Sequence, residues 1–277
     1  MIVPSALTIA GSDSGGGAGI QADLKTFLAL GVHGMSAICA LTAQNTKGVS
    51  GVHEVPPAFV REQISQVATD FEVAAAKTGM LSGPAIVEAV AGSIREFAIP
   101  NLVVDPVFVS KNHDVLLSQD SIDSLTSRLI PLATVITPNL EEAALLTRRE
   151  ISNVNGMREA ARALHALGPA YVLVKGGHLD SDATDVLFDG ETFLEVTTER
   201  IESQNTHGTG CTLSAAIAAY LAKGSSVPEA VKGAKDYVTG AIRYGLEVGK
   251  GYGPTNHGWD STMSSKAQRS RTGHPSG

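Results

Sequence analysis

The sequence has little cysteine, no segment typical of membrane insertion and no leader-like N-terminus. Its two cysteines, Cys39 and Cys211, are too few and too far apart for the disulfide framework of a small secreted protein. Residues 1–10 are apolar but lack the basic start and the long hydrophobic centre of a signal peptide. No apolar run reaches the roughly 18 residues of a membrane span. We therefore expect a cytoplasmic protein without a membrane partner.

Aromatic residues and positive charge are also scarce. Aromatic side chains make up 5% of the 277 residues, so the core must be built mainly from Ala, Val, Leu and Ile. The formal net charge of −7 argues against a nucleic-acid partner. In contrast, 43% of the residues are hydrophobic and 29 are glycine. This composition favours a sizeable core with many tight turns or close contacts between backbone and ligand.

Short apolar runs alternate with amphipathic stretches along the chain. The runs have the length of strands buried on both faces, and they lie at 6–10, 35–41, 74–77, 102–105, 135–137 and 171–175. The helical patterns lie at 18–30, 57–70, 84–97, 119–130, 157–167, 215–222 and 226 to about 249. This alternation predicts an α/β fold with a mostly parallel sheet. A predicted hairpin over 186–196 gives the sheet an antiparallel edge. We expect one domain over residues 1–259 and a disordered tail over 260–277.

The segment Asn-Thr-His-Gly-Thr-Gly-Cys-Thr-Leu-Ser at 205–214 precedes one of the apolar helical stretches. A helix N-terminus carries unpaired N–H groups and partial positive charge, and Gly208 and Gly210 would let a phosphate approach them. Cys211 would lie in the first turn, where we expect its thiol to ionise more readily. The segment therefore predicts an anion-binding site with a candidate base, and a glycine-rich cap on an ordinary helix is the alternative. It is not a Walker A loop.

Polar side chains follow three of the predicted strands. Asp105 follows the run at 102–104, Asn139 and Glu142 follow 135–137, and Lys175 ends the run at 171–175. Ligands of open α/β sheets bind beyond the carboxyl ends of the strands. Carboxylates suit a hydrated Mg²⁺, and a lysine suits a phosphate oxygen. Each residue alone could instead cap a helix or lie at the surface. Together with 205–214 they supply the groups that phosphoryl transfer needs.

The first predicted strand runs into a loop at 11–19 with five glycines. A dinucleotide-binding Rossmann motif would need an acidic residue at the end of the next strand. That strand ends instead in Thr42-Ala43-Gln44. A Rossmann dehydrogenase is therefore disfavoured, and a flexible connection is the other alternative to a ligand-binding loop.

With these motifs, the sequence resembles a known family, the hydroxymethylpyrimidine/phosphomethylpyrimidine kinases of the ribokinase-like superfamily. The resemblance covers about residues 6–259, and its most specific part is 205–214 with its cysteine. The other matching stretches are 9–23 (Ile-Ala-Gly-Ser-Asp-Ser-Gly-Gly-Gly-Ala-Gly-Ile-Gln-Ala-Asp), 41–46, 77–81, 104–107, 137–142 and 174–178.

The resemblance implies a three-layer α/β/α sandwich without a separate lid domain. It implies an enzyme that transfers the γ-phosphate of ATP, with Mg²⁺, to 4-amino-5-hydroxymethyl-2-methylpyrimidine and to its monophosphate in thiamine biosynthesis. A homodimer is expected. The implied site residues are Cys211, Gly208 and Gly210 for catalysis; Gly11, Asp23, Gln44, Met80 and Val107 for the pyrimidine; Asn139, Lys175 and Thr209 for the nucleotide and its phosphates; and Asp105 and Glu142 for the metal.

The residue types fit these implied roles. The amide of Gln44 offers a donor and an acceptor to an aminopyrimidine edge, and Met80 and Val107 offer apolar walls. A hydroxymethyl group near Cys211 could pass its proton to a thiolate.

The sequence departs from the family at 108–114, Phe-Val-Ser-Lys-Asn-His-Asp, where small residues are usual. This leaves acceptance of the monophosphate open: Lys111 or His113 could meet its charge, or the loop could be a neutral variant. Three alternative functions also remain. They are a pyridoxal or pyridoxine kinase on the same fold, a thiol hydrolase with Cys211 as nucleophile and His207 as base, and a non-catalytic nucleotide-binding regulator.

Overall fold

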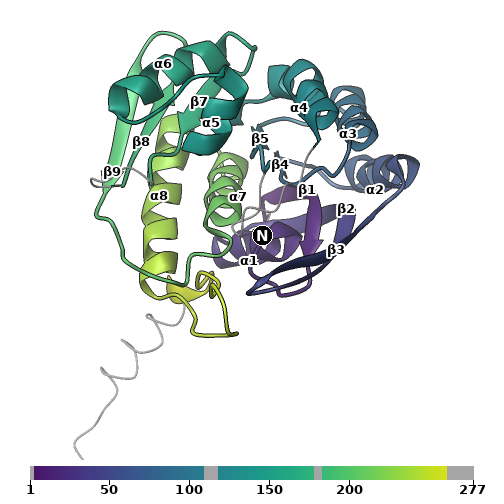
Figure 1. The fold of residues 1–277 in the computed structure, drawn as a ribbon. Coiled ribbons are helices and arrows are strands. Elements are labelled where there is room, and N and C mark those ends of the chain that lie inside the picture. The colour runs from purple at the N-terminus through teal and green to yellow at the C-terminus, as the bar shows by residue number, and fades with distance from the viewer. Residues whose placement is uncertain (1–2, 109–117, 178–182, 261–277) are drawn as a thin grey trace, which may run out of the picture.

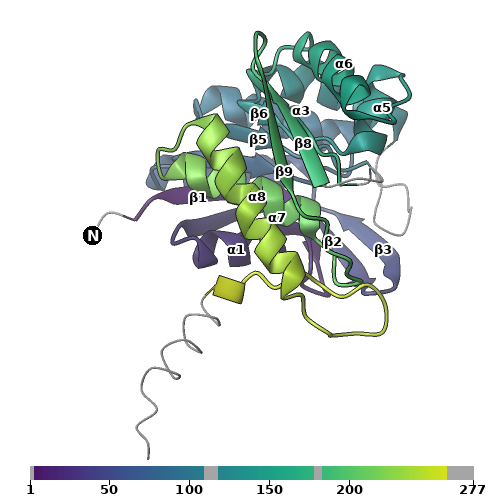
Figure 2. The ribbon, with the colours of Figure 1, turned by 90° about the vertical axis from the view of Figure 1, so that its left-hand side faces the viewer.

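The computed structural model describes residues 3–108, 118–177 and 183–260. The strands of these residues form one sheet in the order β3-β2-β1-β4-β5-β6-β7-β8-β9 (Figures 1 and 2). The strands are β1 Ser5–Asp13, β2 His33–Asn45, β3 Gly48–Glu54, β4 Ala75–Thr78, β5 Leu102–Val104, β6 Val135–Ile136, β7 Tyr171–Val174, β8 Ala183–Phe188 and β9 Phe193–Thr198. The helices are α1 Gly19–Ala29, α2 Pro57–Asp70, α3 Pro84–Glu96, α4 Gln119–Ser124, α5 Leu140–Thr147, α6 Val154–His165, α7 Thr209–Ala222 and α8 Val227–Arg243.

The centre of the sheet is parallel from β2 through β1, β4, β5 and β6 to β7. The predicted hairpin is β8 and β9, which pair antiparallel beside β7. The expected mostly parallel α/β fold with an antiparallel edge is therefore confirmed. The opposite edge is antiparallel as well, because β3 folds back along β2. Strand β3 was not predicted, since Gly48–Glu54 is polar, largely exposed and without an apolar run.

Two hydrophobic cores lie on the two faces of the sheet. On one face, α2, α3, α5 and α6 pack on buried strand residues such as Leu7 and Val104. On the other, α1, α7 and α8 pack on the alternate residues, such as Ala6 and Val103. Successive residues of a strand point to opposite faces, so burial of both faces explains why the central strands are continuously apolar.

The helix starts follow local capping rules. Pro57 and Pro84 occupy the first turns of α2 and α3, where the missing N–H is tolerated. Asn139 and Glu142 form a reciprocal capping box at the start of α5. The box also fixes the orientation of the Asn139 and Glu142 side chains just beyond the end of β6.

The last predicted helix is shorter than expected. It ends at Arg243 instead of near residue 249, and the chain then turns back along the molecule. We call residues 246–255 the C-terminal strap. Its Tyr252 N–H bonds the carbonyl of Thr46 at 2.9 Å, and the carbonyl of its Gly253 accepts the N–H of His207 at 3.0 Å. The strap thus joins the β2–β3 turn to the segment before α7, and these tertiary bonds replace the helical ones.

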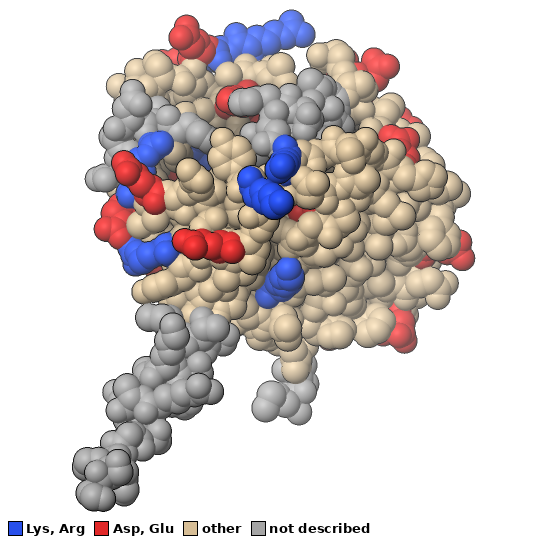
Figure 3. All heavy atoms as spheres, turned by 60° about the horizontal axis from the view of Figure 1, so that its bottom comes forward, with Lys and Arg blue, Asp and Glu red and all other residues tan. Residues whose placement is uncertain are grey.

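Within the described ranges, none of the helices has the length and apolarity that crossing a bilayer requires. The face drawn in Figure 3 shows few Lys and Arg side chains, interspersed with Asp and Glu on a mostly uncharged surface. Of the tail expected over 260–277, residues 261–277 lie outside the described residues.

Candidate active site

The predicted site residues meet at one edge of the sheet, where the parallel strands have their carboxyl ends. Strand order reverses between β1 and β4, which is the place where α/β sheets open a crevice for ligands. Asp105 directly follows β5, and Lys175 directly follows β7. Asn139, after β6, forms an isolated parallel bridge with Lys175. The edge therefore gathers residues that lie up to about seventy positions apart in the chain.

The N-terminus of α7 points at this edge. Gly208, its N-cap, has φ +83°, a left-handed conformation that suits glycine. A Cβ atom at Gly208 would lie 1.8 Å from the carbonyl oxygen of Gly17, so the segment before α7 packs directly on the glycine loop after β1. A Cβ atom at Gly210 would lie 3.5 Å from Lys175 Nζ and 3.6 Å from Asp105 Oδ2. The first turn of α7 and the Lys175–Asp105 pair thus border the same space.

Lys175 links two carboxylates. Its Nζ lies 2.9 Å from Asp105 Oδ1 and 4.0 Å from Glu142 Oε2. Burial would raise the pKa of Asp105, but Lys175 and Lys77 hold it below its ordinary value. Burial raises the pKa of Glu142 to about 7, with Lys175 only partly offsetting it. Asp105 is further held by the hydroxyl groups of Thr137 and Ser214. The result is a fixed cation between two acids.

The donor set at this position fits Mg²⁺. Asp105 and Glu142 are the two acids beside Lys175, and Mg²⁺ keeps several waters and needs only one or two carboxylates besides a substrate's phosphates. The described residues contain no cluster of three His, Cys, Asp or Glu side chains, so an all-protein cage is not formed among them. A cation here would also favour the charged form of Glu142, which burial alone disfavours.

Cys211 lies in the first turn of α7, as predicted, and is half-buried. The expectation that its thiol ionises readily is wrong for the structure of the free protein. Burial raises the pKa of Cys211 to about 11, although Lys77 and the backbone N–H of Gly19 act in the opposite direction. The stabilisation from the helix N-terminus and the nearby ammonium is therefore smaller than the cost of removing a thiolate from water.

Asp23 does not line open space. Its carboxylate is fully buried and lies within 3.0 Å of Lys77 Nζ through both oxygens, and Thr8 donates a further hydrogen bond at 2.6 Å. Although burial alone would lower the pKa of Lys77, Asp23 raises it above its ordinary value. Lys77 was not among the predicted site residues. The sequence did contain a signal for this ion pair. Lys77 ends the apolar run at 74–77, and a charged side chain that is buried with such a run needs a partner.

Three of the residues predicted to bind the pyrimidine lie near or beyond the carboxyl ends of the adjacent strands β1, β4 and β5. Gly11 in β1 donates its N–H to the carbonyl of Met80, and a Cβ at Gly11 would lie 2.5 Å from Met80 Cε. Val107 follows β5, the neighbour of β4, and is half-buried. Gly11 and Met80 are therefore in direct contact, and Val107 lies beyond the end of the next strand. Residues 109–114 of the unusual loop, with Lys111 and His113, lie outside the described residues.

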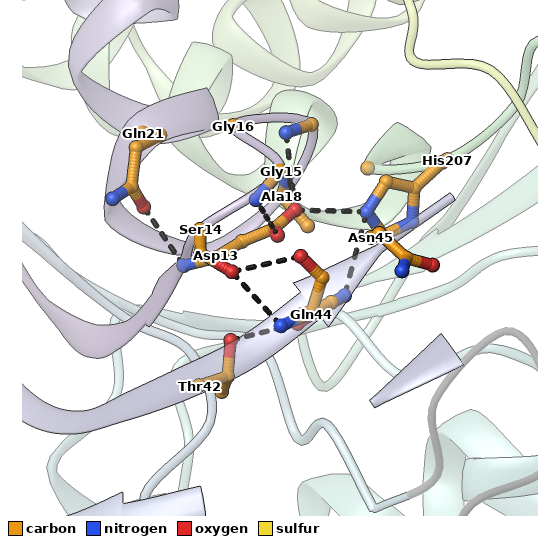
Figure 4. Close-up of polar contacts among 12 residues, drawn as sticks. Asp13, Ser14, Gly15, Gly16, Ala18, Gln21, Thr42, Gln44, Asn45 and His207 are labelled. Atoms are coloured by element: carbon orange, nitrogen blue, oxygen red, sulfur yellow. Dashed lines mark hydrogen bonds and ion pairs between the residues drawn. The ribbon is translucent and has the colours of Figure 1, made fainter. Parts of the chain in front are cut away.

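Gln44 belongs to a polar cluster that joins three segments (Figure 4). Its Nε2 lies 3.5 Å from Nε2 of His207, and its Oε1 lies 3.1 Å from Thr42 Oγ1. Nε2 of His207 also lies 2.9 Å from Oδ2 of Asp13. Asp13 accepts three backbone N–H groups of the glycine loop, at 2.8 to 3.0 Å. Asp13 was not among the predicted site residues, and His207 was predicted only as the base of a thiol hydrolase.

The hydrolase alternative gains no support from this geometry. The described hydrogen bonds of the His207 ring are with Asp13 and Gln44, and none of the described hydrogen bonds joins this ring to Cys211. A nucleophile and its base need to be within hydrogen-bonding reach.

A shallow groove lies at the opposite edge of the sheet, at the amino ends of β1 and β2, and is lined by Val3, Leu30 and Phe71. It contains none of the predicted site residues.

Together, the fold and this edge define a phosphotransfer enzyme of the ribokinase-like class. The chain belongs to the phosphomethylpyrimidine kinase family, whose model matches residues 13–256. It is 54% identical over 256 residues to the hydroxymethylpyrimidine/phosphomethylpyrimidine kinase of Streptomyces coelicolor. The aligned region covers 92% of this chain and 95% of that relative. It is 53% identical over 254 residues to the thiamine biosynthesis bifunctional protein ThiED of Geobacter sulfurreducens, covering 91% of this chain and 52% of that one.

Among solved structures, the chain is similar to an ADP complex of Bacillus subtilis pyridoxal kinase. The two share 43% identity with a TM-score of 0.88, over 94% of this chain and 99% of that one. The comparisons confirm the family and the fold expected from the sequence.

Proposed function

We propose that the chain transfers the γ-phosphate of ATP, with Mg²⁺, to 4-amino-5-hydroxymethyl-2-methylpyrimidine, and then to its monophosphate. The observation that carries the proposal is the position of Gly210. It lies beside Lys175 and Asp105 at the start of α7, at the same sheet edge as Gly11, Met80 and Gln44. A phosphoryl group and a small ring can therefore lie side by side there. The relatives' names support this substrate and a role in thiamine biosynthesis.

The transfer needs mainly alignment and neutralisation of charge. In the proposed complex, Asn139, Lys175 and Thr209 hold the nucleotide phosphates, and Asp105 and Glu142 hold the metal, which neutralises phosphate charge when bound. The N–H groups at Gly208 and Gly210 stabilise the migrating phosphoryl group. Because the transition state is loose, a protonated Cys211 thiol can orient the hydroxymethyl oxygen, and the proton of that hydroxyl leaves late, to the transferred phosphoryl group or to water.

A pyridoxal kinase is the second candidate, and the similarity to the Bacillus subtilis enzyme favours it. The polar cluster around Gln44 favours the pyrimidine instead. An amide side chain matches a ring edge that presents an amino group next to a ring nitrogen. Pyridoxal offers no such adjacent pair.

The test is product analysis by mass spectrometry after incubation with Mg-ATP and either alcohol. We expect the pyrimidine monophosphate first and the diphosphate later, with a higher kcat/KM for the pyrimidine than for pyridoxal. A tenfold preference for pyridoxal would contradict the proposal. Accumulation of the monophosphate without any diphosphate would limit the activity to the first step.

We also propose that the active species is a homodimer. Equilibrium sedimentation of the purified chain should give a mass of twice 28.7 kDa. A monomer with full activity would contradict this.

A further inference from the structure

The cluster of Asp13, His207 and Gln44 determines which hydrogen-bonding groups the site can present. The backbone N–H groups of Gly15, Gly17 and Ala18 donate hydrogen bonds to the side chain of Asp13. In all three bonds, an oxygen of Asp13 is the acceptor. The pKa of Asp13 is correspondingly lowered: burial would raise it, but the bond to His207 and the backbone donors outweigh burial. The side chain is a carboxylate without a hydrogen to donate.

His207 must therefore supply the hydrogen in its contact with Asp13. Nε2 lies 2.9 Å from Asp13 Oδ2, and this short contact between two acceptors would be repulsive unless Nε2 carries a hydrogen. Nε2 carries it both in the neutral Nε2–H tautomer and in the imidazolium ion. The ring therefore cannot accept a hydrogen bond at Nε2 in either state.

This restricts the amide of Gln44. With its nitrogen 3.5 Å from His207 Nε2, two donors would face each other. Amide nitrogen and oxygen are assigned from the hydrogen-bond network and can be exchanged by turning the group over. In the turned orientation, the oxygen lies near Nε2 of His207 and shares its one hydrogen with Asp13, and the nitrogen faces Thr42 Oγ1. Thr42 can accept there, because its own hydrogen bonds the carbonyl of Ser12 at 2.8 Å.

We propose that His207, held by Asp13, is a positioning residue that sets the orientation of the Gln44 amide and thereby selects ring alcohols with an amino group beside a ring nitrogen. The inference rests on the proposed pyrimidine substrate. The hydroxymethyl group has to reach the start of α7, so the ring cannot turn over to suit the opposite amide orientation. In the set orientation, the amide oxygen accepts from the amino group and the amide N–H donates to the ring nitrogen. In the opposite orientation, donor meets donor and acceptor meets acceptor.

The first test reads the hydrogen directly. Nitrogen-15 NMR of the full chain should show His207 with a hydrogen on Nε2. The signal is assigned by its absence from the spectrum of His207→Gln. A neutral ring protonated at Nδ1 instead would overturn the inference, whatever the substrate proves to be.

The second test uses two variants and two alcohols. His207→Leu removes the donor, whereas His207→Gln places an amide N–H near the position of Nε2. With His207→Leu, we expect the KM of the aminopyrimidine alcohol to rise about tenfold, the loss of about one oriented hydrogen bond. The KM of the analogue without the amino group should rise less, and the KM of ATP should not change. His207→Gln should restore most of the selectivity between the two alcohols.

An equal rise of KM for both alcohols, or for ATP as well, would mean that His207 only holds the loop together. Failure of His207→Gln to restore selectivity would also overturn the inference. If the wild-type chain phosphorylates neither pyrimidine, the proposed function itself is wrong, and the NMR result still decides the protonation of His207. Thermal unfolding of both variants shows whether they are folded before these values are compared.

Discussion

Lys175 Nζ lies 2.9 Å from Asp105 Oδ1, and this ion pair spans two strands that are not adjacent in the sheet. The pair lies next to the start of α7, where the phosphoryl group is proposed to bind, so its loss should lower catalysis as well as stability. We predict that Lys175→Met lowers kcat at least about a hundredfold, the order expected when one oriented charge is removed from a transition state. Steady-state kinetics check the prediction. Lys175→Arg is the matched control, because it keeps the positive charge, and it should retain more activity. Equal losses of kcat in the two variants would show that the charge of Lys175 does not explain the effect.

Two glycines of the same segment should respond differently to alanine. At Gly210 the added Cβ meets Lys175 and Asp105 at ordinary contact distances, so Gly210→Ala should fold normally but occupy space next to the phosphoryl group. At Gly208, φ is +83° and the added Cβ would overlap the backbone of Gly17. Gly208→Ala should therefore lower the melting temperature, whereas Gly210→Ala should lower kcat with little thermal shift. The reverse assignment would contradict the described packing.

The thiol of Cys211 should react slowly at neutral pH. Burial raises its pKa to about 11, so the thiolate fraction in the free protein rises through the alkaline range up to that value. The rate of iodoacetamide alkylation at Cys211, followed by mass spectrometry, should increase steadily from pH 7 to pH 10. Cys39 should react more slowly, since burial raises its pKa to about 12. A rate that is already constant above pH 8 would mean that the thiolate forms much more easily. Cys211→Ala serves as the control for the site of reaction.

The buried pair of Lys77 and Asp23 should be sensitive to the loss of one partner. Both side chains have 0% exposure, so Lys77→Met leaves a carboxylate without its counter-charge. We expect a loss of about 3 to 5 kcal/mol in the free energy of unfolding, measured by urea denaturation at pH 7. Adding Asp23→Asn removes the unpaired charge and should recover part of that loss. A double variant that is less stable than Lys77→Met would show that the charge of Asp23 is not the cause.

His257 should make the protein less stable in acid. Burial lowers its pKa from 6.5 to about 4, and the charges of Lys25 and His207 act in the same direction. The unfolded chain takes up the proton near pH 6.5 and the folded chain only near pH 4, so the free energy of unfolding falls as the pH is lowered between these values. A shift of this size corresponds to about 3 kcal/mol. The comparison is urea unfolding at pH 7 and pH 4.5 for the wild type and for His257→Gln. The variant should lose less, and parallel losses would assign the acid sensitivity to other groups.

Much of the fold follows from local pattern. Each predicted apolar run became a strand of the parallel centre or of the β8–β9 hairpin, because burial on both faces leaves a direct mark on the sequence. β3 left no such mark, since its residues are polar and pair with β2 at an exposed edge. The end of α8 was also not predictable, because the strap's bonds to Thr46 and His207 decide it and come from distant parts of the chain.

The candidate site shows the same division. Asp105, Asn139, Glu142 and Lys175 were predicted from their positions at strand ends, and the structure places them together. Their roles with ATP and Mg²⁺ stay predictions. The state of the Cys211 thiol was not predictable from its place in a helix, because the surrounding burial outweighs the helix terminus. The Asp13–His207 contact joins residues 194 positions apart, and no local pattern announces it.

The strap has a consequence for how the chain can be shortened or labelled. It meets the β2–β3 turn at Thr46, where the backbone N–H of Gly251 lies 3.0 Å from the threonine oxygen, and it meets His207 on the other side. Removing everything after Arg243 would leave every strand of the sheet and helices α1 to α8 in the chain. It would, however, remove the contacts that hold the β2–β3 turn and the segment before α7 to the strap. A fluorescent probe on the exposed Val248 would sit on that anchor and could report ligand entry without touching the pocket.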